Sequence, residues 1–207
     1  MGSIVKPCMT RRHTLIVILV VAASLLLTHA AQIVYFPKGA EHWYPKHLQA
    51  MKEPSLFQQS TNKEVEQYRF LWLRTFHKPI VVRVRKDAAA ITLRVVLLRG
   101  AGGYDPGKIE HEESFTLTPD QWDGLLKLLS KSSFWDTPSA EKDLGGLDGS
   151  QRILEGQAGG RYHMVDRWTP SSDGEKRHLD NFVACCRYLL TLSKQEIPKN
   201  DDYRNQV

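Results

Sequence analysis

The sequence has few cysteines and cannot form a framework of disulfide bonds. Two of its three cysteines, Cys185 and Cys186, are neighbours, and Cys8 lies far away near the amino terminus. Adjacent cysteines rarely bridge one another, and no C-x-x-C pair is present, so the usual cysteine zinc and redox motifs are excluded. A domain built from this sequence must therefore depend on its hydrophobic core.

The sequence also lacks the motifs that identify common enzymes. The segment His111–Glu113 resembles the start of an H-E-x-x-H zinc helix, but Phe115 stands at the position of the second histidine. No serine lies in a G-x-S-x-G elbow. The sequence therefore predicts no catalytic residue, no metal site and no cofactor.

A glycine-rich segment, Gly102–Lys108, has the spacing of a phosphate-binding loop. Such a loop needs a serine or threonine next, to hold the metal, and then a helix. Ile109 occupies the hydroxyl position, and a strand is predicted after it. We interpret the segment as a loop between two strands, with a turn at Asp105–Gly107.

Acidic residues are absent before Glu41, and the chain has one long apolar run, Thr14–Leu27. Three basic residues precede this run: Lys6, Arg11 and Arg12. A basic segment followed by about 7–15 apolar residues is typical of an export signal. The run predicts that the rest of the chain works outside the cytoplasm.

Two interpretations of this segment stay open. Thr28 and Ala30 suit the −3 and −1 positions of a cut after Ala30, which would release the domain into the periplasm. Uncleaved, residues 14–36 would form one membrane-spanning helix, with the domain on the periplasmic side of the inner membrane and Tyr35 and Phe36 at headgroup level. The membrane is then a partner through this segment.

The net charge of +5 includes the three basic residues before the apolar run, so residues 32–207 carry a net charge of only +2. Nucleic-acid binding needs a clustered basic face, and the sequence does not predict it.

The chain is expected to divide into four parts. Residues 1–36 form the signal or anchor, residues 37–64 a polar linker broken by prolines, residues 65–195 a globular domain, and residues 196–207 a loose polar tail. His42 and His47 fall in the expected linker, where their spacing fits no helical metal pair, and they are expected on the surface.

The fold class is predicted to be α+β, with the signal or anchor helix followed by an antiparallel sheet of about five strands and two helices packed on one face. Residues 68–73 have apolar side chains in both phases, which fits a buried strand or a short helix. Strands are predicted at 80–85, 91–98 and 108–117, and a hairpin at 151–168.

Both helices of the predicted domain have apolar residues at helical spacing. The first begins at Thr118, where Pro119 and Gln121 complete a capping box. The second is predicted from about Gly174 to Ser193, with Asp173 as its cap and Cys186 as a small core residue.

The candidate binding residues lie in two segments and are Arg74, His77, Arg161, His163, Asp166, Arg167 and Trp168. Strand alternation puts Arg161, His163 and Arg167 on one face of the hairpin, and Asp166 and Trp168 on the other.

Three interpretations of these residues stay open. Asp166 can pair with Arg74, Arg152 or a backbone amide and fix the hairpin, while Glu155 and Arg161 pair across its turn. The arginines and His163 can instead form a surface for a ligand. Acid–base catalysis would need His77 or His163 to meet Asp148 or Asp166.

Four strings resemble a family of uncharacterised bacterial exported proteins. They are YRFLWLRTFHKPIVVRV (68–84), GAGGYDPGK (100–108), LDGSQRILEG (147–156) and GGRYHMVDRWTP (159–170). The resemblance covers roughly residues 66–193 and implies a bacterial envelope protein without an assigned activity.

The sequence therefore predicts a non-catalytic binding or interaction module held near the membrane, with an envelope protein or a small polar ligand as its partner. A hydrolase with a non-standard His/Asp site and a structural envelope scaffold are the alternatives.

Overall fold

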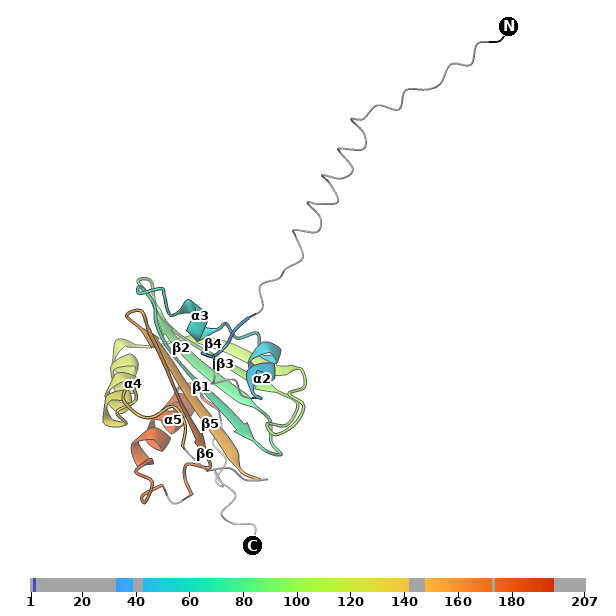
Figure 1. Ribbon diagram of the computed structural model, residues 1–207. Helices are drawn as coiled ribbons and strands as arrows, with labels where there is room; N and C mark the ends of the chain where they lie inside the picture. Colours follow the sequence, from blue (N-terminus) through green and yellow to red (C-terminus); the bar gives the residue numbers. More distant parts are fainter. Residues whose placement is uncertain (1, 3–32, 39–42, 142–147, 173, 196–207) are drawn as a thin grey trace. The chain divides into compact units, whose positions relative to one another are not determined.

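The computed structural model describes residues 2, 33–38, 43–141, 148–172 and 174–195 (Figure 1). The predicted apolar run 14–27, the cut after Ala30 and the tail 196–207 lie outside these residues. Among the helices within the described ranges, none is long and apolar enough to cross a membrane.

The domain is built on one antiparallel sheet of six strands in the order β4-β3-β2-β1-β5-β6. The strands are β1 (Glu66–Arg74), β2 (Ile80–Lys86), β3 (Ile91–Leu98), β4 (Ile109–Thr116), β5 (Ser150–Ala158) and β6 (Arg161–Trp168). The α+β class and the antiparallel sheet are confirmed, and residues 68–73 belong to a strand. The expected count of about five strands was slightly low.

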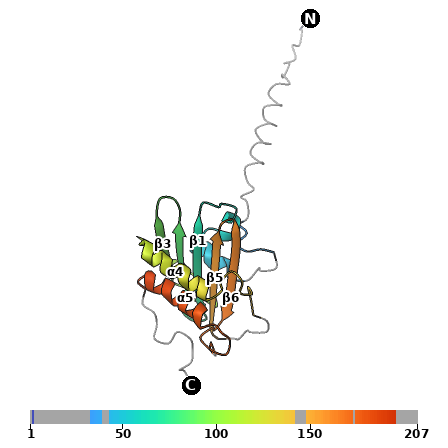
Figure 2. The same cartoon turned by 90° about the vertical axis from the view of Figure 1, so that its left-hand side faces the viewer.

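Helices α4 (Pro119–Lys131) and α5 (Asp180–Leu192) cover one face of the sheet (Figure 2). The capping box of α4 is present: the Thr118 hydroxyl accepts from the Gln121 N–H at 3.2 Å, and the Gln121 side chain accepts from the Thr118 N–H at 2.9 Å. The apolar stripe of α4, including Trp122 and Leu125, is buried against the strands.

Helix α5 begins later than expected, at Asp180 rather than near Gly174. His178 has a φ of 55°, in the left-handed region, so the helix cannot run through this position. The predicted cap, Asp173, lies outside the described residues. Cys186 is a buried core residue as expected, and burial raises the pKa of the neighbouring Cys185 thiol.

The second face of the sheet is covered by the segment that the sequence analysis assigned to a linker. This segment contains the short helices α2 (Pro45–Ala50) and α3 (Leu56–Gln59). Leu48 and Met51 are fully buried there with Leu71 of β1. The linker prediction was wrong because β1 is apolar on both of its faces, and a strand of that kind needs cover on both.

A row of charged residues crosses the middle of this second face. Glu155 of β5 faces Arg69 of β1, Arg69 faces Arg83 of β2, and Arg83 faces Arg94 of β3. The Arg69 side chain is fully buried, and its Nη2 lies 2.6 Å from a carboxylate oxygen of Glu155. Burial raises the pKa of the Glu155 carboxyl, and the Arg69 guanidinium opposes that rise.

Glu53, which follows α2, lies in the covering segment and binds the arginines of this row. Its fully buried carboxylate lies 2.8 Å from Nε of Arg83 and 3.5 Å from Nη1 of Arg69, and it also binds Arg94. The arginines hold the backbone of the same segment too, because Arg69 donates to the Pro54 carbonyl at 2.6 Å and Arg94 to the Met51 carbonyl at 2.9 Å. We call these five residues, Glu53, Arg69, Arg83, Arg94 and Glu155, the buried ion cluster.

His47 of α2 is also buried, with none of its surface exposed, although the sequence analysis expected it on the surface. Its ring lies in edge-to-face contact with Trp43, 5.3 Å between centroids. Burial and the nearby charge of Lys46 lower the pKa of His47 to about 4, while the backbone of Ala101, just before the glycine-rich segment Gly102–Lys108, opposes this shift.

Replacing Glu53 should strongly destabilise the fold. The Glu53→Gln variant leaves three arginines with one buried carboxylate between them, and removing one partner of a buried ion pair costs about 3–5 kcal/mol. Urea unfolding followed by far-ultraviolet circular dichroism measures the loss. The control is the exposed Glu64→Gln, which should change the unfolding free energy by less than about 0.5 kcal/mol. Equal losses in the two variants would contradict the role given to Glu53.

His47 should make stability depend on pH. The unfolded chain binds a proton at His47 near the ordinary value of 6.5, and the folded chain only near 4. The unfolding free energy should therefore fall by about 3 kcal/mol as the pH drops from 6.5 to 4.

The His47→Phe variant should lack this part of the pH dependence, as shown by urea unfolding at several pH values between 7 and 4. The control is His111→Gln, which changes an exposed histidine on β4. A His47→Phe profile parallel to that of the original chain would contradict the prediction.

Candidate functional site

A groove of about 470 Å³ opens at the end of the sheet where β1 ends and β2 begins. Trp72 of β1 and Ile80 of β2 are register partners, and both point toward the face that carries α5. Leu97 of β3 and Leu190 of α5 complete the apolar part of the lining. The volume lies within the range of small-molecule sites in proteins.

Four basic side chains also line the groove, and we therefore call it the basic groove. They are Arg74, His77, Lys78 and Arg99. Lys78 is held at the surface by Glu110 of β4, 2.7 Å away. Burial and the neighbouring Arg74 lower the pKa of His77, so this ring carries no charge at neutral pH.

Two guanidinium groups lie over the indole ring of Trp72. The Arg74 group lies 4.3 Å from the ring centroid and the Arg152 group 5.3 Å from it. A cation over an indole face is attracted by the ring, so these contacts fix the direction of both arginines. Arg74, the last residue of β1, is thereby held at the wall of the groove.

The glycine-rich loop, residues 99–108, packs against the β1–β2 connection. The Gly102 N–H donates to the His77 carbonyl at 2.9 Å, and the Gly103 N–H donates to the Thr75 carbonyl at 3.0 Å. A Cβ on Gly102 would lie 2.5 Å from the Arg74 carbonyl oxygen, so only glycine allows this approach. The loop thus positions the side chains of Arg74 and His77.

The structure also confirms the interpretation of this segment as a loop between strands. The Asp105 carboxylate accepts from the Gly107 N–H at 2.7 Å, and Gly107 has a φ of 68°. The next element is β4, a strand rather than the helix of a phosphate-binding site.

A pair of exposed aromatic rings marks the edge of the basic groove. Phe76, which lines the groove, stacks on Tyr104 of the glycine-rich loop with centroids 5.9 Å apart and planes inclined at 28°. Phe76 is 55% exposed and Tyr104 is 56% exposed. Large apolar side chains that stay this exposed in contact with one another are typical of interaction sites.

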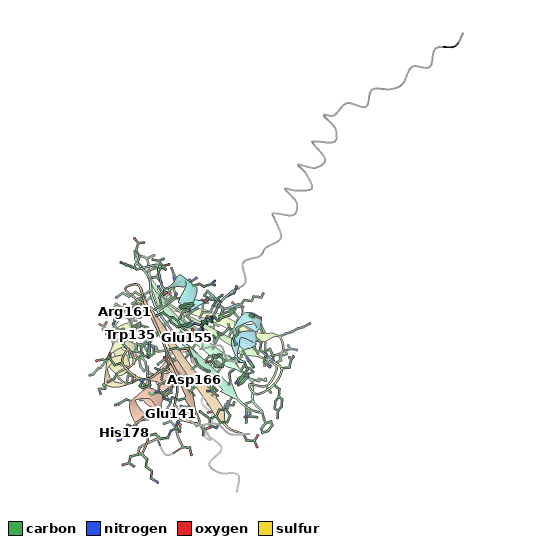
Figure 3. The ribbon with its side chains drawn as sticks, in the orientation of Figure 1. Trp135, Glu141, Glu155, Arg161, Asp166 and His178 are labelled. Carbon is green, nitrogen blue, oxygen red and sulfur yellow. The ribbon has the colours of Figure 1, made fainter. Side chains whose placement is uncertain are left out.

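Of the predicted binding residues, Arg74 and His77 lie in the basic groove, whereas three residues of β6 lie elsewhere. Arg161 stacks on Trp135, 4.6 Å from the ring centroid (Figure 3). The His163 ring donates to the Thr137 carbonyl at 2.9 Å, and Arg167, only 3% exposed, donates to the Pro138 carbonyl at 2.7 Å.

The three residues therefore hold residues 134–139 along the edge of β6. The expectation of an open ligand surface made by Arg161, His163 and Arg167 was wrong for Arg167, because its side chain is buried. The expected pair of Glu155 and Arg161 is not formed either, since Glu155 binds Arg69 and accepts from Tyr162 at 2.8 Å.

Asp166 and Trp168 lie on the other face of β6, in a smaller pocket of about 180 Å³. The Asp166 carboxylate accepts from the Tyr44 hydroxyl at 3.3 Å and from the Gln151 amide. Neither of these two partners was predicted for Asp166, and Tyr44 comes from the segment that was assigned to the linker. The second carboxylate of this pocket, that of Glu141, pairs with Arg177.

The structure does not bring His163 together with Asp166, because alternation along β6 directs them to opposite faces of the sheet. Asp148 is exposed beside the end of β1, where the Thr75 N–H donates to the Gly149 carbonyl at 3.0 Å. The four residues of the expected His/Asp site are thus divided between the two faces and the end of the sheet.

Among the predicted site residues, only Arg74 and His77 belong to the basic groove, and the residues that the sequence did not single out include Trp72, Lys78 and Arg99. Lys78 and Arg99 stand next to strand ends, and two adjacent antiparallel strands, β2 and β3, bring these ends together. That pairing was predictable from the two strands, but the contribution of α5 to the groove was not.

No group of three histidine, cysteine, aspartate or glutamate side chains in the described ranges is placed to hold a metal ion. No protein-family model matches this chain, and no curated protein matches it.

Proposed function

We propose that this chain is a non-catalytic binding module of the bacterial envelope, held near the membrane by its amino-terminal segment, and that the basic groove is its binding surface. The sequence supports the location through the basic segment and the apolar run before residue 28. The resemblance to bacterial exported proteins points to the same compartment.

The observation that carries the binding role is the composition of the basic groove. Four basic side chains and several apolar ones share one concave surface, and two stacked aromatic rings lie exposed at its edge. Concave sites with an apolar lining and a few converging polar groups are where proteins usually bind ligands.

Site-specific cross-linking in intact bacterial cells tests this proposal. The full chain carries a photoreactive benzoylphenylalanine at position 76, and the control carries it at position 89, an exposed position in the turn between β2 and β3. We expect a discrete adduct, of a protein or a small molecule, from position 76 alone. Identical adducts from both positions, or none from position 76, would contradict the groove as binding surface.

Fractionation of the same cells tests the location. The chain should be recovered from the envelope and be cut by protease added to spheroplasts. Recovery from the cytoplasm in a protease-protected form would contradict the envelope assignment, and amino-terminal sequencing would distinguish the cleaved from the anchored form.

A further inference from the structure

Trp72, which lines the basic groove, carries a hydrogen-bond donor without an acceptor. Trp72 is only 2% exposed, and its indole nitrogen Nε1 has no hydrogen-bond partner within the part of the chain that the structure describes. A buried donor that lacks an acceptor destabilises the protein by about 1–3 kcal/mol. A ligand that places an acceptor there would remove this penalty.

The charges around Trp72 select an anionic acceptor. Arg74 lies over the indole ring, and Arg99 lines the same groove. No acidic residue is found among the described residues that line the groove. An Arg guanidinium matches the planar geometry of a carboxylate, and hydrogen bonds to ionised groups are about twice as strong as neutral ones.

The other side chains that line the groove are mainly apolar and favour a ligand with an apolar part. Ile80, Leu97 and Leu190 form its wall, and the ring of Phe76 extends this wall to the surface. A volume of about 470 Å³ suits a single small molecule. The ligand should therefore be amphipathic, with one carboxylate and one apolar or aromatic part.

We propose that the basic groove binds a small amphipathic carboxylate, whose head accepts the Trp72 indole N–H and pairs with Arg74 and Arg99 while its apolar part lies against Leu97 and Leu190. This inference rests on the proposed function and adds the chemical class of the ligand to it.

The probe is 4-phenylbutyrate, which is compared with 4-phenylbutyramide and 4-phenylbutylamine. The protein is the full chain in lipid nanodiscs, with ¹⁵N-labelled indole groups on its five tryptophans. Nuclear magnetic resonance should show a saturable shift of one indole N–H signal with the carboxylate only. This signal should be the one that is missing in Trp72→Phe, which keeps an aromatic ring but removes the donor.

Calorimetry should show that Trp72→Phe and Arg99→Gln each weaken the binding of 4-phenylbutyrate by about tenfold. Arg99 is exposed, so Arg99→Gln should leave the fold intact. This variant therefore tests the inference even if Trp72→Phe fails to fold. The matched control is Arg161→Gln, an exposed arginine that contacts Trp135 outside the basic groove, and it should bind as the original chain does.

Equal binding of the carboxylate, the amide and the amine would overturn the inference, as would a Trp72 signal that does not move. If the carboxylate fails while cross-linking from position 76 still captures a specific partner, the ligand class is wrong and the binding module stands. If both fail, the basic groove is not a binding surface.

Discussion

The second face of this sheet depends on one carboxylate, that of Glu53. Arg69, Arg83 and Arg94 stand side by side on three neighbouring strands, where like charges directly opposite one another are destabilising. Glu155 neutralises Arg69 from one end of the row, and Glu53 reaches all three arginines from the segment above. Glu112 of β4 binds Arg94 as well, 2.8 Å away. The strands and the covering segment therefore stabilise each other, because Glu53 reduces the repulsion between the arginines and the arginines anchor the segment.

The buried ion cluster is connected to the basic groove through a series of contacts. The buried ion cluster holds the end of α2, and α2 places His47 close to Ala101 in the glycine-rich loop. The same loop bonds to the carbonyls of Thr75 and His77, which form the connection beside the groove. A change on the second face can thus alter a groove on the first face, because the loop at the end of the sheet touches both.

Local sequence patterns predicted most of the sheet and one helix boundary. Alternating apolar residues indicated β2, β3 and the β5–β6 hairpin, and Thr118 with Gln121 indicated the start of α4. The cover on the second face was missed because a segment with three prolines and many polar residues is typical of a linker. Leu71 and Leu73, apolar residues in the second phase of β1, were the signal that this face also needed cover.

Local sequence patterns could not predict the buried ion cluster or the basic groove, for a different reason. In the sequence, each arginine of the row resembles an ordinary exposed strand residue. Only the strand register shows that the three arginines lie side by side. The groove combines strand ends with α5, which begins 82 residues after the end of β3. Strand alternation did place His163 and Asp166 on opposite faces, and this geometry argues against a catalytic pair made of these two residues.

The most direct test of the account is an experimental structure of the full chain with 4-phenylbutyrate bound. A carboxylate oxygen should lie within about 2.7–3.2 Å of Trp72 Nε1, with the phenyl group against Leu97 and Leu190. A ligand bound in the pocket of Asp166 and Trp168, or a Trp72 nitrogen already bonded to another part of the chain, would contradict it.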